Sequence, residues 1–368
     1  MKKKFWMLGV AVAALTSCTQ SEVVDVPESK LIGFDSFVDK PTRALAGDIE
    51  SVNDFDMFYV FGSYGTKNGD KFTREDGNRK FYLHNLAAQK SVSGSTVTWN
   101  YEKRQWIENK IFRFAAYADG KSDAVDPAQI GTVEFIENTE STDLTTDFVG
   151  TDNVSNRTNS WGLKFTDYVA ENKDLVAAVP LERSIGTLTA QPLPVALSFR
   201  HLLSKVIFEV ENQSDNIYLK VEPINLTISD KGDCLALYGE RTNDGGNIEA
   251  HANVYWKPST TTTTKALFDN HAPLGKTTMT EEFYVIPQSN DITLENIVLK
   301  SVSSDGNSVY STFTIPTPSL ANGAQNMWLP GVVYRYIITY SPGGYSIEFT
   351  ATADSWSDAG YANKPLQN

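Results

Sequence analysis

The stretch YRYIITYSPGGYSIEFTATA, residues 334–353, alternates apolar and polar side chains on both sides of a Pro-Gly-Gly turn. A period of two places the apolar side chains on one face of a β-strand. Proline followed by two glycines supplies the backbone angles of a tight turn. The stretch therefore predicts an antiparallel hairpin of two half-buried strands. Its apolar positions are Tyr334, Tyr336, Ile338 and Tyr340, then Tyr345, Ile347, Phe349, Ala351 and Ala353.

The same period of two recurs along most of the 368 residues, for example at 193–199 and 206–210. Long amphipathic helical patterns are scarce. Many short alternating runs predict an all-β protein, and the length suits two antiparallel β-sandwich domains in tandem. Proline and glycine interrupt the pattern between residues 179 and 193. We therefore predict a boundary at residue 185, with domains at 19–185 and 186–368.

The first eighteen residues have the pattern of a lipoprotein signal peptide. Three lysines precede an apolar run that is too short to cross a membrane as a helix. The run ends in LTSC, residues 15–18, where cleavage before Cys18 would leave a thiol that carries diacylglycerol. An ordinary signal peptide cut after Ala13 or Ala14 is the alternative. Both interpretations predict export, and the first also predicts a lipid anchor.

Cysteine content and charge exclude two classes of protein. The chain has two cysteines, so acylation of Cys18 leaves Cys234 without a disulfide partner. Stability must then come from a hydrophobic core rather than from a disulfide framework. The formal net charge is −13. A surface of that sign repels phosphate backbones, so we expect no nucleic acid partner.

Residues that could carry catalysis or hold a metal are scattered. The four histidines lack neighbours at metal-ligand spacing, and His201 is interpreted as a structural residue. No HExxH, GxSxG or GxxxxGK motif is present. SDKGD, residues 229–233, has two aspartates beside a glycine, but a turn explains it as well as a calcium loop does. We expect no catalytic activity, no metal and no cofactor, and a secreted hydrolase is the least favoured class.

Arg43 lies in VDKPTRALAGD, residues 38–48, between two alternating apolar runs. A solvated loop arginine is the simple interpretation. The other is a protease site, because Pro41 and Gly47 oppose strand pairing and keep the loop accessible. A cut after Arg43 would leave residues 31–38 attached to their sheet by noncovalent contacts alone.

Three aromatic residues, Trp99, Tyr101 and Trp106, stand close together in the sequence. Flat aromatic faces stack on sugars, so the three could form a glycan-binding platform. Aromatic residues in strands are also common core residues. Both interpretations stay open at this point.

A series of motifs runs in order along the chain. After LTSC come FDSFVDKPTRA at 34–44, FDMFYVFGSYG at 55–65, WNYEKRQW at 99–106 and FRFAAYA at 112–118. LSFRHLLSKVIFEVEN at 197–212, WLPGVVYRYIITY at 328–340 and YSIEFTATADSW at 345–356 complete the series. In this order and spacing they resemble the Bacteroidales-type fimbrillin family, the Mfa-like group of fimbrial subunits. The resemblance covers essentially the whole chain.

The resemblance implies a two-domain, transthyretin-like β-sandwich subunit of an adhesive surface fimbria. Such subunits are exported as lipoproteins, cut by an arginine-specific protease and polymerised by strand exchange. Carried onto this chain, it makes Cys18 the acylated residue, Arg43–Ala44 the scissile bond and 31–43 the removable strand, with 345–353 as candidate donor. The implied partners are other fimbrial subunits, the protease, the outer membrane through lipid, and a host or bacterial surface ligand. The alternative function is a glycan-binding surface lipoprotein of a polysaccharide-uptake system.

Overall fold

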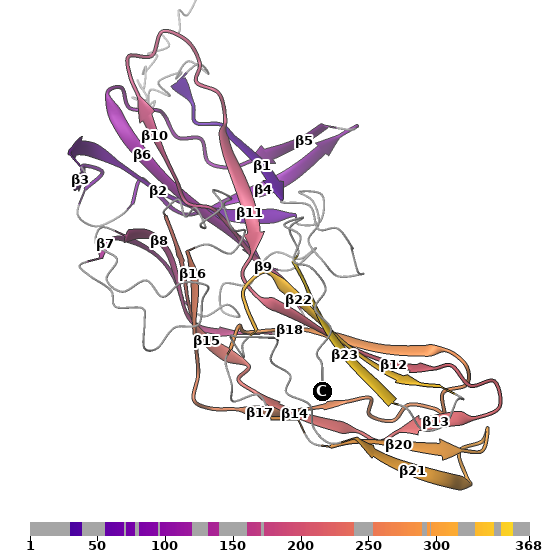
Figure 1. Cartoon of the computed structure of the whole chain (residues 1–368). Coiled ribbons are helices and arrows are strands. Elements are labelled where there is room, and N and C mark those ends of the chain that lie inside the picture. The colour runs from indigo at the N-terminus through magenta and orange to yellow at the C-terminus, as the bar shows by residue number, and fades with distance from the viewer. Residues whose placement is uncertain are drawn as a thin grey trace, which may run out of the picture.

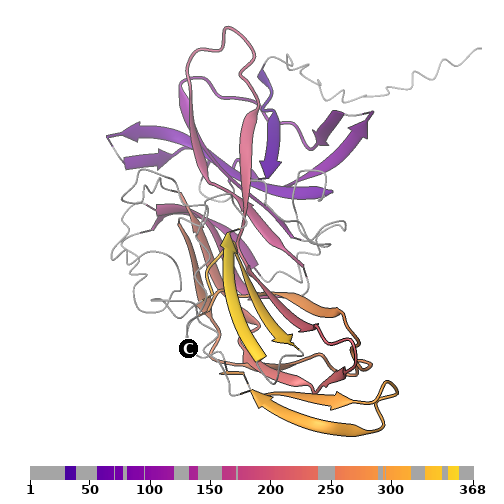
Figure 2. The same cartoon turned by 45° about the vertical axis from the view of Figure 1, so that its right-hand side comes forward.

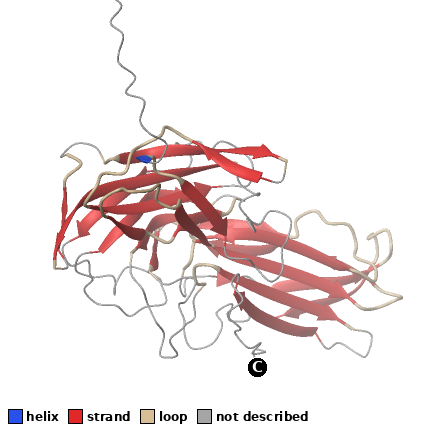
Figure 3. Ribbon diagram, turned by 90° about the horizontal axis from the view of Figure 1, so that it is seen from above, coloured by secondary structure: helices blue, strands red, loops and turns tan. Residues whose placement is uncertain are grey.

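The computed structural model confirms the all-β prediction and shows an elongated molecule of two sandwiches (Figures 1 and 3). Within the residues that it describes, every regular element longer than a turn is a β-strand. The described residues are 30–38, 56–69, 71–77, 81–94, 96–119, 132–139, 160–170, 173–238, 253–288, 293–294, 296–315, 328–341 and 347–355.

The first sandwich packs a nine-stranded sheet against a four-stranded sheet. In the order of pairing, the larger sheet contains β1 (Phe34–Val38), β11 (Val195–His201), β9 (Leu175–Ala178), β6 (Lys110–Asp119), β2 (Met57–Asn68), β4 (Leu83–Ser93) and β5 (Thr96–Asn100), while β10 (Leu181–Ile185) pairs with β6 and β3 (Lys71–Arg74) with β2. The smaller sheet contains β16 (Val254–Pro258), β15 (Lys231–Leu237), β8 (Ser160–Val169) and β7 (Thr132–Thr139).

The nine-stranded sheet is buried on both faces at its centre. Along β2, Tyr59 and Phe61 face the smaller sheet, where they join a cluster that includes Trp161. Phe58 and Val60 point the other way, into a second cluster that the curled sheet encloses on its own concave side. Because successive side chains of a strand point to opposite faces, β2 contributes to two cores at once. Both faces must then be apolar, which explains why β2 and β6 are almost continuous apolar runs in the sequence.

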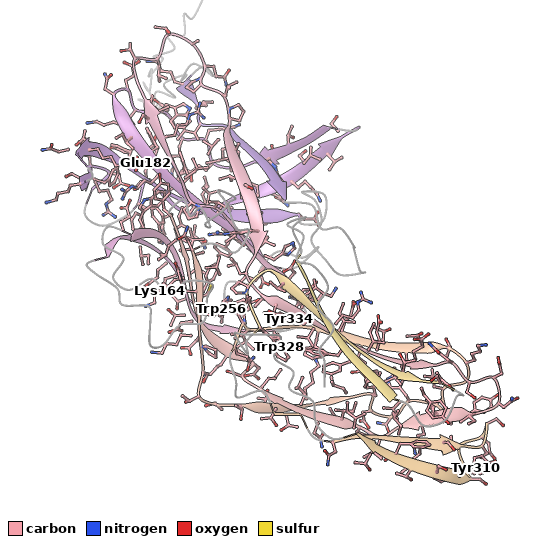
Figure 4. The ribbon with its side chains drawn as sticks, viewed as in Figure 1. Lys164, Glu182, Trp256, Tyr310, Trp328 and Tyr334 are labelled. Carbon is pink, nitrogen blue, oxygen red and sulfur yellow. The ribbon has the colours of Figure 1, made fainter. Side chains whose placement is uncertain are left out.

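The second sandwich encloses a single core. One sheet contains β18 (Thr278–Val285), β12 (Ser204–Asn212), β22 (Val332–Tyr340) and β23 (Ile347–Ser355). Two three-stranded sheets face it: β13 (Tyr218–Val221), β20 (Ile297–Val302) and β21 (Val309–Ile315), and then β17 (Thr263–Leu267), β14 (Ile224–Ile228) and β19 (Thr293–Leu294). In Figure 4 the exposed Tyr310 marks the end of this sandwich that lies far from Glu182 of the first.

The hairpin predicted from residues 334–353 is confirmed. β22 and β23 pair antiparallel from Val332↔Ser355 to Tyr340↔Ile347. β22 pairs on its other side with β12, in parallel, so β23 lies at the edge of the sheet. The two yellow strands lie side by side in Figure 2.

The boundary predicted at residue 185 does not separate the two sandwiches. β11 follows that residue but pairs with β9 and β1, and β15 pairs with β8 of the smaller sheet. The segment 186–194, rich in proline and glycine, is a largely exposed connection between β10 and β11 of one sheet. The prediction failed because strand pairing between distant parts of the chain leaves no trace in the local pattern of residues.

Backbone and side-chain hydrogen bonds join the two sandwiches where the chain passes between them. Trp256 Nε1 of the first sandwich donates to the carbonyl of Leu202 at 2.6 Å. The amide of Gly331, just before β22, donates to the carbonyl of Leu203 at 2.8 Å. Figure 4 places Trp256 and Trp328 close to this junction, and each belongs to the core on its own side.

Candidate functional site

The predicted removable strand contains β1, an edge strand with a distant partner. β1 pairs in parallel with β11, from Phe34↔Val195 to Val38↔Phe199. Two strands that pair in parallel cannot be joined by a tight turn. The chain between β1 and β11 is accordingly long, and β1 is held in place by residues that are distant in the sequence. Arg43 and Ala44, at the other end of the predicted strand, lie outside the described residues, as does Cys18.

The residues just before β1 pair on the other side with the segment that follows β5. The amide of Ile32 donates to the carbonyl of Arg104 at 2.8 Å, and the amide of Trp106 donates to the carbonyl of Lys30 at 2.8 Å. The amide of Val195 donates to the carbonyl of Gly33 at 2.7 Å. Residues 30–38 therefore fill the gap between β11 and residues 104–106, where the curled sheet would otherwise stay open.

Two side chains anchor this segment in the core of the curled sheet. Ile32 is 1% exposed and Phe34 is 8% exposed. The ring of Phe34 meets those of Tyr101 and Phe114 edge to face, at centroid distances of 5.1 and 5.9 Å. Burying two such side chains contributes roughly 3–6 kcal/mol. The free energy that holds the segment comes mainly from these two positions and the backbone hydrogen bonds.

Tyr101 adds a polar contact to the same segment. Its hydroxyl donates to the carbonyl of Ile32 at 2.8 Å. Burial raises the pKa of Tyr101 above the ordinary value for a tyrosine, so the hydroxyl stays a donor at neutral pH. The ion pair of Lys30 with Glu108, 3.7 Å apart, is well exposed and adds at most about 1 kcal/mol.

Trp99 and Trp106 are core residues, so the second interpretation of the aromatic cluster is confirmed for both. They are 7% and 3% exposed. Trp99 contacts Phe58 at a centroid distance of 4.6 Å, and Trp106 contacts Phe112 at 4.9 Å. Buried faces of this kind offer no stacking surface to a sugar.

The candidate donor strand forms β23 in its own domain. Residues 347–355 pair with β22, and Tyr345 lies outside the described residues. Among the described strands, β23 pairs only with β22. An edge strand can leave its sheet without breaking a second ladder of hydrogen bonds.

A buried arginine of β6 contacts four other strands of the first sandwich, namely β3, β7, β8 and β10. The guanidinium of Arg113 lies 3.9 Å from the ring centroid of Phe72 and 4.8 Å from that of Trp161. Its Nε donates to Glu182 at 3.2 Å, and Nη1 lies 3.9 Å from a carboxylate oxygen of Glu137. Burial raises the pKa of Glu137 above its ordinary value, although the hydroxyl of Ser63 and nearby arginines oppose this.

Two of the positions considered for metals and catalysis, His201 and Asp233, make polar contacts within the fold. Nδ1 of the buried His201 lies 2.8 Å from a carboxylate oxygen of Asp174. Within SDKGD, Asp233 accepts a hydrogen bond from the amide of Asp167 at 2.9 Å and belongs to β15. No group of three potential metal ligands occurs among the described residues.

Sequence patterns missed the partners of the removable strand. Residues 101–106 carry no periodic signal that would show that they pair with residues 30–32. The sequence suggested a role for the aromatic ring of Tyr101, whereas in the structure its hydroxyl donates a hydrogen bond to the carbonyl of Ile32. Contacts of this kind depend on tertiary structure that no local pattern encodes.

The sequence matches the model of the family described as fimbrillin-like over residues 42–356. The chain belongs to the fimbrillin-like family. Membership implies a structural protein of a cell-surface fimbria that assembles with other subunits. No helix among the described residues of this fimbrillin-like chain is long and apolar enough to span a membrane.

Solved structures similar to the fimbrillin-like chain include three bacterial proteins. A fimbrial protein from Bacteroides vulgatus is 16% identical, with a TM-score of 0.46 over 89% of this chain and 100% of that one. A candidate cell adhesion protein from Bacteroides uniformis is 15% identical, with a TM-score of 0.43 over 89% and 99%. The tip fimbrial protein Mfa3 from Porphyromonas gingivalis is 11% identical, with a TM-score of 0.31 over 87% and 99%. No curated protein matches the sequence.

Proposed function

We propose that the chain is a non-enzymatic, adhesive subunit of a fimbria that is exported as a lipoprotein and assembled by strand exchange after cleavage between Arg43 and Ala44. The observation that carries the proposal is the position of residues 30–38. They fill a gap in the core of the first sandwich, and they precede Arg43 in the chain. A cut there leaves this segment with noncovalent contacts only.

Departure of the segment creates an acceptor groove. The groove is lined by β11 on one side and residues 104–106 on the other, each with unpaired backbone groups. Its floor contains the sites that Ile32 and Phe34 vacate. Unpaired backbone and exposed apolar surface are both unfavourable in water, so another strand would be recruited.

The candidate donor matches the sequence of the segment that it would replace. Ile347 and Phe349 have the same spacing as Ile32 and Phe34. With these pairs superimposed, Ala351 and Ala353 align with Ser36 and Val38. A donor from one subunit would then insert in the same direction as the strand that left, next to β11 of another subunit.

Export and anchoring depend on Cys18 in this proposal. The lipid on Cys18 would hold the precursor at the outer membrane until an arginine-specific protease acts. Cleavage after Arg43 would break the covalent link between the subunit and the lipidated segment, and departure of that segment would then expose the groove. Polymerisation is thereby linked to arrival at the cell surface.

The test is treatment of the purified precursor, residues 19–368, with an arginine-specific protease. The wild type should lose its N-terminal segment and form ladders on a denaturing gel run without boiling. Arg43→Ala should stay monomeric, and Lys40→Ala is the matched control that should polymerise. Equal polymerisation of wild type and Arg43→Ala would make Arg43 an ordinary loop residue.

The lipid anchor has a separate test. Cys18→Ala in the full chain should leave the signal peptide uncut or the protein without lipid, so that it no longer partitions into detergent micelles. Cys234→Ala is the control because that cysteine is internal and buried. Partition of Cys18→Ala like the wild type would refute the anchor while leaving strand exchange intact.

A further inference from the structure

A cavity of about 340 Å³ lies between β17 and β18 of the second sandwich. Among the described strands, each of these two stands at the end of its sheet, so no pairing between described strands closes this side of the sandwich. The volume falls within the range of small-ligand sites, roughly 300–1,000 Å³. The side chains used below are Asp230, Thr263, Thr264, Lys265 and Phe283, all of which line the cavity.

Lys265 occupies a position where the sandwich would ordinarily have an apolar residue. It shares a face of β17 with Leu267, which is fully buried in the second core. The ammonium of Lys265 lies 4.5 Å from the ring centroid of Phe283, another core residue. Lysine at an inward position is uncommon, because partial burial of an ammonium is unfavourable without a partner.

No carboxylate among the described residues forms an ion pair with Lys265. Glu281 attracts the ammonium of Lys265 electrostatically, but its carboxylate already accepts a hydrogen bond from the amide of Phe268 at 2.6 Å. Burial lowers the pKa of Lys265, and Glu281 only partly opposes this effect. The cavity therefore presents a partly desolvated positive charge that an anionic group could neutralise.

The other polar groups of the cavity restrict the kind of anion. Asp230 also lines it, and no described residue forms a hydrogen bond or an ion pair with its carboxylate. A second negative charge on a ligand would meet this carboxylate and be repelled, whereas ligand hydroxyl groups could donate to it. The hydroxyl side chains of the exposed Thr263 and Thr264 add donors and acceptors at the opening.

We propose that this cavity binds a carboxylate-bearing sugar of the hexuronate type. The single carboxylate of the sugar lies at the ammonium of Lys265, and its ring hydroxyls donate to Asp230 and exchange hydrogen bonds with the two threonines. The ring of Phe283 limits the cavity on the inner side. Such a site goes beyond assembly, because it gives the subunit a ligand of its own on the second sandwich.

The experiment uses the uncleaved chain, residues 19–368, and titrates it with D-galacturonate while two-dimensional NMR spectra are recorded. D-galactose, acetate and inorganic phosphate are titrated separately to distinguish hydroxyl, carboxylate and general anion binding. We expect millimolar binding of galacturonate, at least about tenfold tighter than that of each of the other three. Because no cleavage or polymerisation is involved, failure here leaves the fimbrial function untouched, and the reverse also holds.

Variants locate the site. Lys265→Met should weaken galacturonate binding by about tenfold or more, while Lys265→Arg should retain most of it. Lys276→Met is the matched control, because that lysine is exposed on the connection before β18 and pairs with Asp215. Asp230→Asn keeps the test valid if Lys265→Met unfolds, since it should reduce the preference for galacturonate over acetate. Absence of galacturonate binding, equal binding of acetate or phosphate, or binding unchanged in Lys265→Met and Asp230→Asn would each overturn the proposal.

Discussion

The two edge strands β1 and β23 complete their sandwiches in opposite ways. Six residues, 341–346, separate β22 from β23, and the two strands pair with each other. β1 pairs with β11, whose residues follow about 160 positions later, and residues 30–32 reach across to 104–106. β23 thus pairs with a strand close in sequence, whereas β1 pairs with a strand far away in sequence. A single cut in the chain after β1 would therefore leave β1 without a covalent link to its partner.

The contrast also explains how one subunit could both accept and donate. In the proposed assembly, the N-terminal segment leaves after cleavage because the cut removes its covalent link to the fold. The C-terminal strand stays covalently joined, so when it moves it carries its whole subunit to the next one. An acceptor that loses a strand and a donor that keeps its tether are the two elements of a chain of subunits.

The largest effect on polymerisation is expected from deleting β1 and then from replacing the apolar residues of β23 in the same chain. A chain of residues 44–368 should polymerise without protease, because its groove is open from the start. The same chain with Ile347→Ser and Phe349→Ser should remain monomeric by size-exclusion chromatography. Thr350→Ser, on the other face of the strand, is the control that should polymerise. If the doubly substituted chain still forms polymers, β23 is not the donor strand.

Phe34→Ala should strongly weaken the binding of the segment 30–38 to the rest of the first sandwich. Loss of a buried phenylalanine costs roughly 3–5 kcal/mol. Hydrogen exchange at residues 30–38 should accelerate accordingly, while exchange in β22 and β23 stays unchanged. Leu193→Ala serves as control, since this residue is 78% exposed. Similar exchange in the two variants would mean that Phe34 does not anchor the segment.

Tyr101→Phe should have a smaller effect on the same segment. It removes one hydrogen bond to the carbonyl of Ile32, worth about 1 kcal/mol. Since the pKa of Tyr101 is raised in the folded protein, its stabilising contribution is complete below pH 10 and lost as the pH rises through the folded-state pKa. Hydrogen exchange in the wild type should therefore show an alkaline loss of protection that Tyr101→Phe lacks. Tyr310→Phe, which changes an exposed residue, should behave as the wild type.

The smallest effect concerns pH and the charged cluster around Arg113. Because burial raises the pKa of Glu137, its contribution to stability is complete below the unfolded value near 4.5 and falls as the pH rises through the folded-state pKa. Urea unfolding at several pH values should show Glu137→Gln gaining stability relative to the wild type as the pH rises above 4.5. Glu134→Gln, an exposed position on the same strand, is the control. A difference between wild type and Glu137→Gln that is independent of pH would contradict the direction assigned.

The sequence predicts the strands better than their partners. Alternation at 334–353 identified a hairpin correctly, because β22 and β23 are close in sequence and pair with each other. The boundary at 185 failed since β11 and β15 return to the first sandwich by distant pairing. The sequence left the role of Trp99 and Trp106 open, because their burial depends on contacts with Phe58 of β2 and Phe112 of β6. Lys265 was overlooked because its inward position depends on which face of β17 meets the core.

A disulfide trap tests strand exchange most directly. In the precursor, Thr352 of β23 pairs with Arg335, whereas Ser198 of β11 pairs with Phe37 of β1. If Phe349 replaces Phe34, Thr352 takes the place of Phe37 beside Ser198, at a distance that suits a disulfide. The chain of residues 19–368 with Ser198→Cys and Thr352→Cys provides the pair, and the remaining Cys234 is buried. The companion chain with Ser198→Cys and Thr350→Cys is out of register by two residues.

We predict that mild oxidation after cleavage at Arg43 links neighbouring subunits of the Ser198→Cys, Thr352→Cys chain into covalent ladders. The uncleaved precursor and the out-of-register chain should give little product. Polymers that form without this crosslink, or a crosslink that appears equally without cleavage, would contradict the exchange of β1 for β23.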